Sequence, residues 1–310
     1  MSGRVVSVVI VNWNSGPLLG RCVGSLREHA AGCEIVIVDN ASEDASLDFA
    51  QRSGVSLVLR NDRNVGFAAA NNQGWRASRG ELILFLNPDA ESLPAGVDRL
   101  AERLEKDAAV WAAGGQLIDQ TGNVQAGFNV RAFPSIGAVA AEMLLLDEIW
   151  PRNPWTRRYL MSDWDHSSAR DVDQPAAACL MVRRAGLESL GGFDDAFRPA
   201  WFEDVDLCKR IRGAGGRIVY EPGARFLHHG AVSLRSLKAE TFLQSYHENL
   251  VRYFRKHHGS AAAAQARRLV IAGLCLRGLL AALPTRAGIS SPRAYWRAAR
   301  LLARTGKAGS

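Results

Sequence analysis

The sequence predicts an α/β fold with a doubly wound, mainly parallel sheet and a helical extension at its C-terminal end. Four short apolar runs alternate with helical segments between residues 5 and 89. Carboxylates stand directly after two of these runs, and acidic residues stop at Glu248 while basic ones continue. The first two observations indicate a sheet with a ligand site at one edge, and the third sets the C-terminal region apart.

The four apolar runs have the length and composition of buried strands. They are rich in Val, Ile and Leu and cover residues 5–11, 34–38, 55–59 and 82–86. Parallel strands that are covered on both faces need such continuous apolar sequences. Helices are expected between them, over residues 17–30, after the turn at Asp39, and from the loop at Asn64 to about residue 79.

Asp39 and Asp89 stand just past the second and fourth predicted strands. In open α/β sheets, ligands bind beyond the carboxyl ends of the strands, so both carboxylates are candidate ligand-binding groups. The segment Asn87-Pro88-Asp89 is also typical of a plain turn that stops the strand, with Asp89 capping the next helix. From these residues alone, both interpretations of Asp89 remain open.

The following part of the chain is less regular. A helix is predicted over residues 92–107, and short strands within 110–127. Residues 128–175 contain an apolar segment at 136–146 but have weak periodicity, which is typical of a lid or a binding loop. Three short strands are predicted after it, the last two at a sheet edge, over residues 176–182, 217–221 and 225–227.

A cluster of acids begins a predicted helix that ends near residue 212. Its first residues are Trp201, Phe202, Glu203, Asp204 and Asp206. A helix dipole accounts for one or two acids at this end but not readily for three that follow two aromatic residues. For Asp206 we favour a structural role, as a cap or as a partner of Arg210. Arg210 and Arg212 themselves would either reach a phosphate group or be solvated.

The C-terminal region is basic and mostly helical. Residues 249–310 hold twelve Lys or Arg and no Asp or Glu, so the chain's net charge of +7 leaves about −5 on residues 1–248. Helices are predicted over 237–257, 261–283 and 293–304. The apolar stretch 269–283 contains Arg277 and is shorter than the ~18 residues that a membrane span needs. Amphipathic basic helices suit an anionic membrane surface, although a helical hairpin packed on the body or on a second subunit remains the alternative.

The composition excludes several classes of protein. Hydrophobic residues make up 47% and charged residues 22% of the chain, as in soluble globular proteins. The N-terminal residues lack the pattern of a signal peptide, and five scattered cysteines indicate reduced cytosolic thiols without disulfides or a zinc site. The layout is Rossmann-like, but neither a glycine-rich dinucleotide motif nor a P-loop follows any predicted strand.

Seven motifs, in this order and spacing, resemble family 2 glycosyltransferases of the GT-A fold, and most of all their bacterial rhamnosyltransferase-like branch. The resemblance covers about residues 5 to 258. The motifs are Ser-Val-Val-Ile-Val-Asn-Trp-Asn (7–14), Val-Asp-Asn-Ala-Ser (38–42), Asn-x-Gly-Phe-Ala-Ala-Ala-Asn-Asn-x-Gly (64–74), Leu-Asn-Pro-Asp (86–89), Gly-Gly-Phe-Asp (191–194), Phe-Glu-Asp-Val-Asp-Leu-Cys (202–208) and His228.

This resemblance implies a nucleotide-sugar site on the first half of the chain. Asp39 would accept hydrogen bonds from the base, and Val11 and Trp13 would line the same pocket. Three further residues would shape the donor pocket by close backbone approach and amide contacts, namely Asn64, Gly66 and Asn72. A carboxylate and an indole face suit a pyrimidine base.

The resemblance also implies a metal site. Asp89 occupies the last position of the family's Asp-x-Asp motif, and Asn87 replaces the first acid. His228 would supply a nitrogen ligand, whereas His229 is expected to be incidental. With one carboxylate fewer, the metal should bind weakly or be completed by the donor diphosphate. Mn²⁺ or Mg²⁺ is expected, and the mixed nitrogen and oxygen ligands favour Mn²⁺.

Asp204 would be the catalytic base of an inverting transfer, in which the acceptor hydroxyl is the nucleophile. Glu203 would hold acceptor hydroxyls or orient Asp204, and Trp201 and Phe202 would stack on an apolar sugar face. The implied domains are a catalytic domain over 1–235 and a basic helical region over 236–310. The catalytic domain would have a nucleotide-binding half (1–107) and an acceptor-binding half (108–235).

The implied function is transfer of a sugar, with rhamnose a candidate, from a dTDP- or UDP-sugar to a lipid-linked or saccharide acceptor in cell-wall or surface-polysaccharide synthesis. The protein would be cytoplasmic and peripheral on the inner face of the membrane, held there by its tail, with oligomerisation left open. A non-catalytic nucleotide-sugar-binding protein and a sugar-phosphate nucleotidyltransferase are the alternatives. Nucleic-acid binding is not expected, because the tail lacks interleaved aromatic residues and the body is acidic.

Overall fold

The computed structural model describes residues 5–51, 54–230, 239–283 and 291–305. The chain divides into two compact units. The sheet unit comprises the described residues of 1–133, 164–199 and 203–233, and the helical unit those of 134–163, 200–202 and 234–310. The predicted start of a tail helix at residue 237 and the predicted domain boundary after residue 235 lie outside the described residues.

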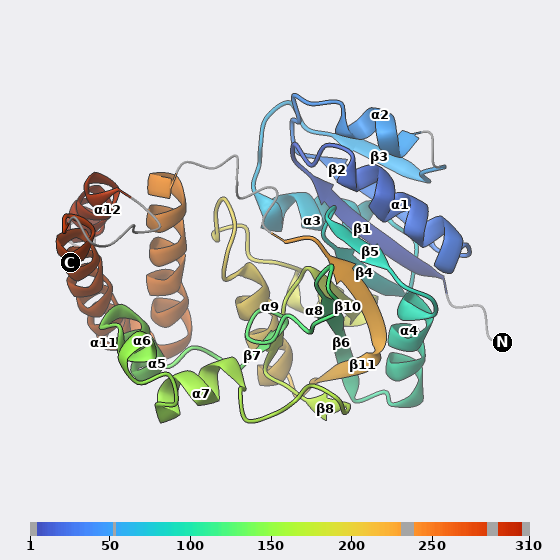
Figure 1. Cartoon of the computed structure of the whole chain (residues 1–310). Helices are drawn as coiled ribbons and strands as arrows, with labels where there is room; N and C mark the ends of the chain where they lie inside the picture. The colour runs from blue at the N-terminus through green and yellow to red at the C-terminus, as the bar shows by residue number, and fades with distance from the viewer. Residues whose placement is uncertain (1–4, 52–53, 231–238, 284–290, 306–310) are drawn as a thin grey trace. The chain divides into compact units, whose positions relative to one another are not determined.

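The sheet unit is built on a nine-stranded sheet in the order β3-β2-β1-β4-β10-β6-β11-β5, with β8 also paired to β11 (Figure 1). The first four neighbours are parallel and correspond to the four predicted apolar runs, which confirms the doubly wound α/β fold. They are β1 (Val6–Asn12), β2 (Glu34–Asp39), β3 (Leu57–Arg60) and β4 (Leu82–Leu86). Every residue of β4 is buried, as its continuous apolar sequence requires.

Three long strands complete the sheet. β10 (Cys179–Arg183) runs antiparallel between β4 and β6 (Val110–Ile118), and β11 (Arg217–His228) runs parallel to β6. Two short strands, β5 (Ala90–Ser92) and β8 (Arg170–Asp171), pair antiparallel with β11. A separate two-stranded sheet joins β7 (Val130–Arg131) to β9 (Gln174–Pro175).

β11 differs from the predicted pair of short edge strands. It is a single strand of twelve residues that pairs with β6, β5 and β8, so it lies within the sheet. The sequence suggested an interruption because Pro222 and Gly223 are typical turn residues. In the structure they belong to a register shift between Glu221 and Arg225, and a bulge of this kind bends a strand without ending it.

Apart from the helix over Arg184–Leu190, which was not predicted, the helices of the sheet unit follow the strands as the sequence predicts. They are α1 (Leu18–His29), α2 (Ser46–Gln51), α3 (Phe67–Ala77), α4 (Gly96–Lys106), α8 (Arg184–Leu190) and α9 (Glu203–Gly213). α1 begins without a side-chain cap after Pro17 and buries Leu19, Cys22, Val23 and Leu26. That spacing of three and four residues is the apolar stripe expected for a helix lying on a sheet.

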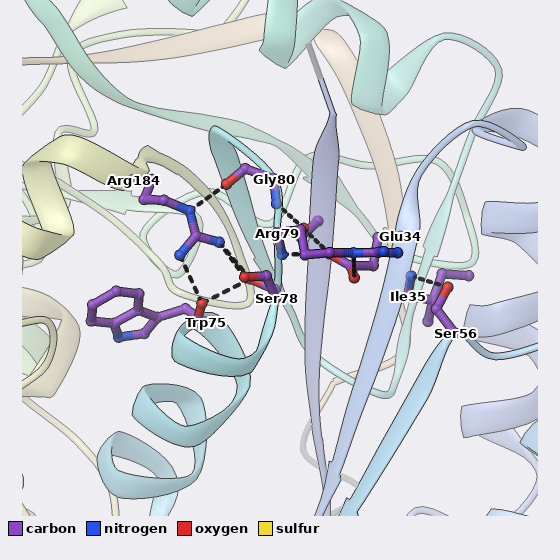
Figure 2. A network of polar contacts seen from close by, with 9 residues as sticks. Glu34, Ile35, Ser56, Trp75, Ser78, Arg79, Gly80 and Arg184 are labelled. Carbon is purple, nitrogen blue, oxygen red and sulfur yellow. Dashed lines mark hydrogen bonds and ion pairs between the residues drawn. The ribbon is translucent and has the colours of Figure 1, made fainter. Parts of the chain in front are cut away.

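Arg184 ties the end of α3 to the start of α8 (Figure 2). Its guanidinium donates to the carbonyl oxygens of Trp75, Ser78 and Gly80 at 3.2, 2.8 and 2.6 Å. The last carbonyls of a helix lack intrahelical partners, so a cation placed there satisfies them and complements the helix dipole. Nearby, Glu34 accepts from the backbone and side chain of Arg79 at 2.8 and 3.1 Å, which fixes the turn into β4.

The helical unit contains much of the segment that was expected to be a loop. Residues 136–160 form three helices, and the described part of the C-terminal region forms two, with a kink at Gly259 in the first (φ 84°). They are α5 (Ile136–Met143), α6 (Leu146–Ile149), α7 (Pro154–Leu160), α11 (Ala239–Ala281) and α12 (Pro292–Thr305). Residues 134–163 therefore fold with the C-terminal helices, and the weak periodicity of residues 128–175 conceals three short helices. A lid or binding role for this segment stays a prediction.

Close packing explains why residues 136–146 were difficult to assign. Gly273 of α11 lies so close to Met143 that a Cβ atom there would be 2.7 Å from the Met143 carbonyl oxygen. Arg277 donates to the carbonyl oxygens of Met143 and Glu142 at 2.8 and 2.6 Å, so this cation inside an apolar stretch caps α5. No helix among the described residues is long and apolar enough to cross a membrane.

The contact between α3 and the sheet gives a first prediction. A Cβ atom at Gly74 would lie 2.4 Å from Cγ1 of Val9 and 3.1 Å from Cγ2 of Val38. We expect Gly74→Ala to lower the free energy of unfolding by roughly 1–2 kcal/mol, because overpacking outweighs the better helix propensity of alanine. Urea denaturation monitored by circular dichroism measures the effect.

Gly24→Ala in α1 is the matched control. Nothing lies within 4 Å of a Cβ atom at Gly24, so this variant should be stabilised by about 0.5–1 kcal/mol. Equal stabilisation of both variants would contradict the close approach of α3 to the sheet.

Candidate functional site

Asp39 lies at the carboxyl end of β2, opposite Asn12 of β1. It is almost completely buried, and its Oδ1 accepts from Nδ2 of Asn12 at 2.8 Å. Oδ2 accepts from the backbone N–H of Ser42 at 3.3 Å, which holds the turn that follows the strand. The carboxylate is thus held rigidly at the sheet edge where the sequence predicted a ligand-binding group.

The two apolar residues predicted beside Asp39 have different surroundings. Val11 is 7% exposed and packs with Val38 and Ala70 in a small cluster beneath α3. Trp13 follows β1 and remains partly exposed. Trp13 therefore presents more surface to a base than Val11 does.

Asn64 and Gly66 form a braced loop before α3. Oδ1 of Asn64 accepts from the Gly66 N–H and from Nδ2 of Asn40, both at 2.9 Å. Gly66 has a φ of 93° and would place a Cβ atom 3.1 Å from the Pro199 carbonyl oxygen, so only glycine fits here without strain. This is the close backbone approach that the sequence predicted, although here it is made to the protein itself.

Asn72 differs from the predicted donor contact. Its Nδ2 donates to the carbonyl oxygen of Phe193 and to Oδ1 of Asp195, at 2.8 and 2.7 Å. Its Oδ1 accepts from Nε1 of Trp75 at 2.9 Å and from the Phe193 N–H at 3.0 Å. An amide side chain has two N–H groups and two lone pairs, and all four are used. Asn72 therefore holds the turn at residues 191–195.

Asp89 and His228 lie together inside the sheet unit. β5 pairs with β11 so that His228 stands opposite Ala90, one residue after Asp89. Both side chains are buried, and Nε2 of His228 is 3.5 Å from Oδ1 of Asp89. That distance is too long for a good hydrogen bond, but it suits two ligands that share one small cation. Nε2 has no hydrogen-bond partner among the described residues.

Gln125, which the sequence did not single out, fixes the tautomer of His228. Its Nε2 donates to the His228 carbonyl oxygen at 2.8 Å, and this places Oε1 2.7 Å from Nδ1 of the same residue. Because an amide oxygen can only accept, this contact places a hydrogen on Nδ1, and Nε2 of a neutral ring would present its lone pair toward Asp89. Phe128 stacks on the imidazole with ring centres 5.1 Å apart, which limits its rotation.

The neighbours of this pair are engaged elsewhere. His229 contacts Oε1 of Glu91 at 2.6 Å and Nε2 of Gln120 at 2.9 Å, consistent with an incidental role. Asn87 is half-buried, and its carbonyl oxygen accepts from the Ala90 N–H at 3.1 Å, which closes the turn after β4. No group of three or more His, Cys, Asp and Glu among the described residues is placed to hold a metal.

Asp204 is the second residue of α9 and is partly exposed. Its Oδ2 accepts from Nε2 of Gln174 at 3.1 Å and from the Ala177 N–H at 3.2 Å. Its Oδ1 accepts from the N–H of the next residue, Val205, at 2.8 Å. Desolvation raises the pKa of the carboxyl, and the backbone hydrogen bonds oppose that rise only in part. The result is a carboxylate that is oriented by three donors yet more basic than an ordinary aspartate.

Glu203 precedes it and is 5% exposed. Burial and then the charge of Asp204 raise its pKa well above the usual value, and its Oε2 has no hydrogen-bond partner within the described structure. A buried carboxyl of this kind favours its neutral form. Direct contact between Glu203 and an acceptor sugar is therefore less well supported than an electrostatic effect on Asp204.

Asp206 has the structural role that its position suggested. It is fully buried and accepts from Nε of Arg210 at 2.7 Å, one helical turn later. The Arg210 guanidinium also donates to the carbonyl oxygens of Leu190 and Gly192 at 3.0 and 2.7 Å. Arg210 is thus neither solvated nor free to bind a phosphate group, whereas Arg212 is exposed.

Trp201 and Phe202 belong to the helical unit. Phe202 is 4% exposed and packs against Tyr246 and Tyr253 with ring centres 5.2 and 6.0 Å apart. Trp201 meets the edge of Phe242 at 4.9 Å and is partly exposed. Burial gives Phe202 a packing role instead of the predicted stacking on a sugar, and acceptor stacking stays a prediction for Trp201.

Comparisons with known proteins identify the family of the chain. The family model of glycosyl transferase family 2 matches residues 7–167. The chain is 30% identical over 292 residues to N-acetylglucosaminyl-diphospho-decaprenol L-rhamnosyltransferase of Mycobacterium tuberculosis. The aligned region covers 89% of this chain and 92% of that relative.

Two structures that are 18% identical to the chain share its fold. The crystal structure of GalNAc-T7 with UDP, GalNAc and Mn²⁺ has a TM-score of 0.60 over 82% of this chain, which spans 48% of the length of that structure. Mannosyltransferase PcManGT from Pyrobaculum calidifontis, in complex with GDP-Man and Mn²⁺, has a TM-score of 0.57 over 98% of this chain and 79% of its own. The chain therefore belongs to glycosyl transferase family 2, is a glycosyltransferase and has the GT-A fold.

Proposed function

We propose that this protein is an inverting, metal-dependent glycosyltransferase that moves a sugar from a dTDP- or UDP-sugar to a lipid-linked saccharide. The observation that carries the proposal is the buried pair of Asp89 and His228, whose unpartnered Nε2 faces a carboxylate. A buried ring nitrogen that accepts no hydrogen bond costs free energy, and binding a cation through its lone pair removes that cost. The relative named as an L-rhamnosyltransferase makes rhamnose the first sugar to test.

Asp204 would act as the base. The acceptor hydroxyl attacks the anomeric carbon, its proton passes to the Asp204 carboxylate, and the bond from that carbon to the nucleoside diphosphate breaks. Gln174 and the Ala177 N–H hold Oδ2, which fixes the direction in which the carboxylate receives the proton. Attack opposite to the leaving group inverts the configuration at the anomeric carbon, and one base suffices for it.

Asp89 and His228 would hold the metal. One carboxylate and one imidazole fill only part of a coordination shell, so donor phosphate oxygens would supply further ligands. The bound cation would neutralise the charge that develops on the departing diphosphate. Nitrogen ligation favours Mn²⁺ over Mg²⁺. Asp39 and Trp13 would hold the base of the donor at the neighbouring strand ends.

The basic C-terminal region would bring the enzyme to an anionic membrane surface, on the inner face of the cytoplasmic membrane. The M. tuberculosis relative is named for a decaprenol-linked acceptor, and such a substrate resides in a membrane. The twelve basic residues after Glu248, with no acid among them, supply the electrostatic attraction.

Asp204→Asn tests the role of the base. We expect transfer from dTDP-rhamnose, UDP-galactose or UDP-GlcNAc to fall at least 100-fold, because the amide accepts no proton. Donor affinity, measured by calorimetry with Mn²⁺, should change less than about threefold. A matching loss of donor affinity would move Asp204 into the donor site, and Asp206 is no substitute because Arg210 already pairs with it.

The pH dependence of kcat/KM provides a second test of Asp204. Because the pKa of Asp204 is raised, activity should fall on acidification at a pH above the ordinary aspartate value of 3.8. Gln174→Leu removes a donor to the ionised form and should move this acidic limb up by roughly one pH unit. Gln73→Leu, at an exposed position of α3, is the control and should leave the limb unchanged. An unmoved limb in Gln174→Leu would show that another group titrates.

Asp89→Ala tests the metal site. We expect most activity to be lost and the remainder to be independent of Mn²⁺, because only the imidazole would remain as a protein ligand. Glu91→Ala removes an acid two residues away that contacts His229, and it should keep the Mn²⁺ dependence. Mn²⁺ titrations of initial rates measure both variants. An unchanged titration in Asp89→Ala would contradict the assignment.

A further inference from the structure

Exposed large apolar side chains are concentrated in the helical unit. Of the ten found among the described residues, seven belong to it, and four of these lie within the twelve residues from Leu144 to Trp155. The most exposed is Ile149 at 78%, followed in this segment by Trp150 at 53% and Trp155 at 47%. Scattered single apolar residues are common on surfaces, but such a run marks an interaction surface.

A built turn holds these side chains outward. α6 ends at Ile149, and Asn153, which is fully buried, caps α7 by accepting from the Thr156 N–H at 2.9 Å. Nδ2 of Asn153 donates to the Trp150 carbonyl oxygen at 2.9 Å, and the Asn153 N–H donates to the same oxygen at 2.9 Å. These hydrogen bonds fix the backbone of the turn in a conformation that leaves its apolar side chains exposed.

Helix α5, which precedes the turn, is held by α11. α5 packs against α11, and Arg277 of α11 caps the last carbonyls of α5, at Glu142 and Met143. Gly137 of α5 would place a Cβ atom 2.3 Å from Cδ1 of Trp155, so one side of that indole lies on α5 while about half of it stays exposed. Figure 1 shows the three short helices α5, α6 and α7 in succession beside α11.

Exposed basic residues lie close in sequence to these apolar residues. Arg152, Arg157 and Arg158 are exposed, against the acids Asp147 and Glu148, and the same unit carries the acid-free region that follows Glu248. Tryptophan and arginine on one surface suit the boundary between lipid headgroups and acyl chains, where the indole buries its ring and the guanidinium meets phosphate. A second copy of the chain is a poorer partner, because a symmetric contact would bring the arginines of one copy close to the same arginines of the other, and these charges repel.

We propose that residues 144–158, here called the docking turn, bind an anionic lipid bilayer. Ile149, Trp150 and Trp155 enter the interfacial region, and Arg152, Arg157 and Arg158 pair with lipid phosphates. The proposal rests on the proposed function, because it assigns the membrane contact of an enzyme with a lipid-linked acceptor. It adds that α6 and α7, at the centre of the chain, make this contact in addition to the basic tail.

The test compares the full chain with variants in co-sedimentation with vesicles. In vesicles of phosphatidylglycerol and phosphatidylethanolamine, the double variant Ile149→Ser/Trp150→Ser should bind at least tenfold more weakly than the wild type. Phe49→Ser removes an aromatic side chain of 44% exposure from α2 in the sheet unit and should bind like the wild type. Arg157→Gln/Arg158→Gln should weaken binding and reduce its salt dependence. Circular dichroism checks that each variant is folded.

Insertion can be observed directly at Ile149. Cys275 is the one cysteine that is not buried, so an environment-sensitive dye can be attached to Ile149→Cys in a Cys275→Ser background. The dye should shift to shorter wavelength and gain intensity on these vesicles and remain unchanged on phosphatidylcholine. The same dye on Phe49→Cys should not respond on either kind of vesicle.

The outcomes separate this proposal from the proposed function. Binding and dye response that are independent of residues 149 and 150 would overturn the docking turn. So would self-association of the wild type that the double variant abolishes, since that would make the surface a protein interface. Transfer to a short-chain, water-soluble diphospho-saccharide acceptor should be equal in the wild type and the double variant. If neither transfers sugar to it, the proposed function fails whatever the vesicles show.

Discussion

The pairing of β11 with both β6 and β5 is the constraint on which the candidate metal site depends. β11 pairs with β6 along one edge as far as Leu227, and on its other edge its last residues pair with β5, which follows the turn that carries Asp89. The pairing with β6 continues past the register shift between Glu221 and Arg225, as far as residues that also pair with β5. As a result His228, 139 positions after Asp89 in the sequence, faces its carboxylate. In another register of β5 and β11, His228 would not lie next to Asp89.

The sheet unit stabilises its buried carboxyl groups in different ways, and the differences separate structural from functional residues. Asp206 is neutralised by Arg210, and Asp39 is held by neutral donors from Asn12 and Ser42. Glu203 has its pKa raised by burial, and it lies next to Asp204. Burying an uncompensated charge is costly, so each group needs either a partner or a proton. Asp89, whose carboxylate lies 3.5 Å from the unpartnered Nε2 of His228, is the one whose surroundings favour a cation.

The fold was largely predictable from the sequence because its strands are local signals. The runs at residues 5–11 and 82–86 are apolar throughout, and such runs require burial on both faces wherever they lie in the chain. The candidate site residues were predicted through motifs at the ends of these strands. Asp39, Asp89 and His228 lie at or next to the ends of strands, and their roles stay predictions, whereas Asn72 and Phe202 proved to be engaged within the protein.

What the sequence could not predict depends on contacts between distant residues. Gln125 has no distinguishing pattern, and its importance follows only from two hydrogen bonds to His228. β11 was divided in two because Pro222 and Gly223 are local turn signals that tertiary pairing overrides. Residues 136–160 are helical because α11 supports α5, a contact more than a hundred residues away in sequence.

The central claim is that Asp89, His228 and the donor diphosphate hold one cation together. Electron paramagnetic resonance of Mn²⁺ tests it most directly, by measuring free Mn²⁺ in the presence of the full-length protein with and without UDP or dTDP. We expect weak binding of Mn²⁺ alone and binding at least tenfold tighter with the nucleotide. The enhancement should disappear in His228→Leu. Mn²⁺ affinity that is the same with and without nucleotide, or unchanged in that variant, would contradict the account.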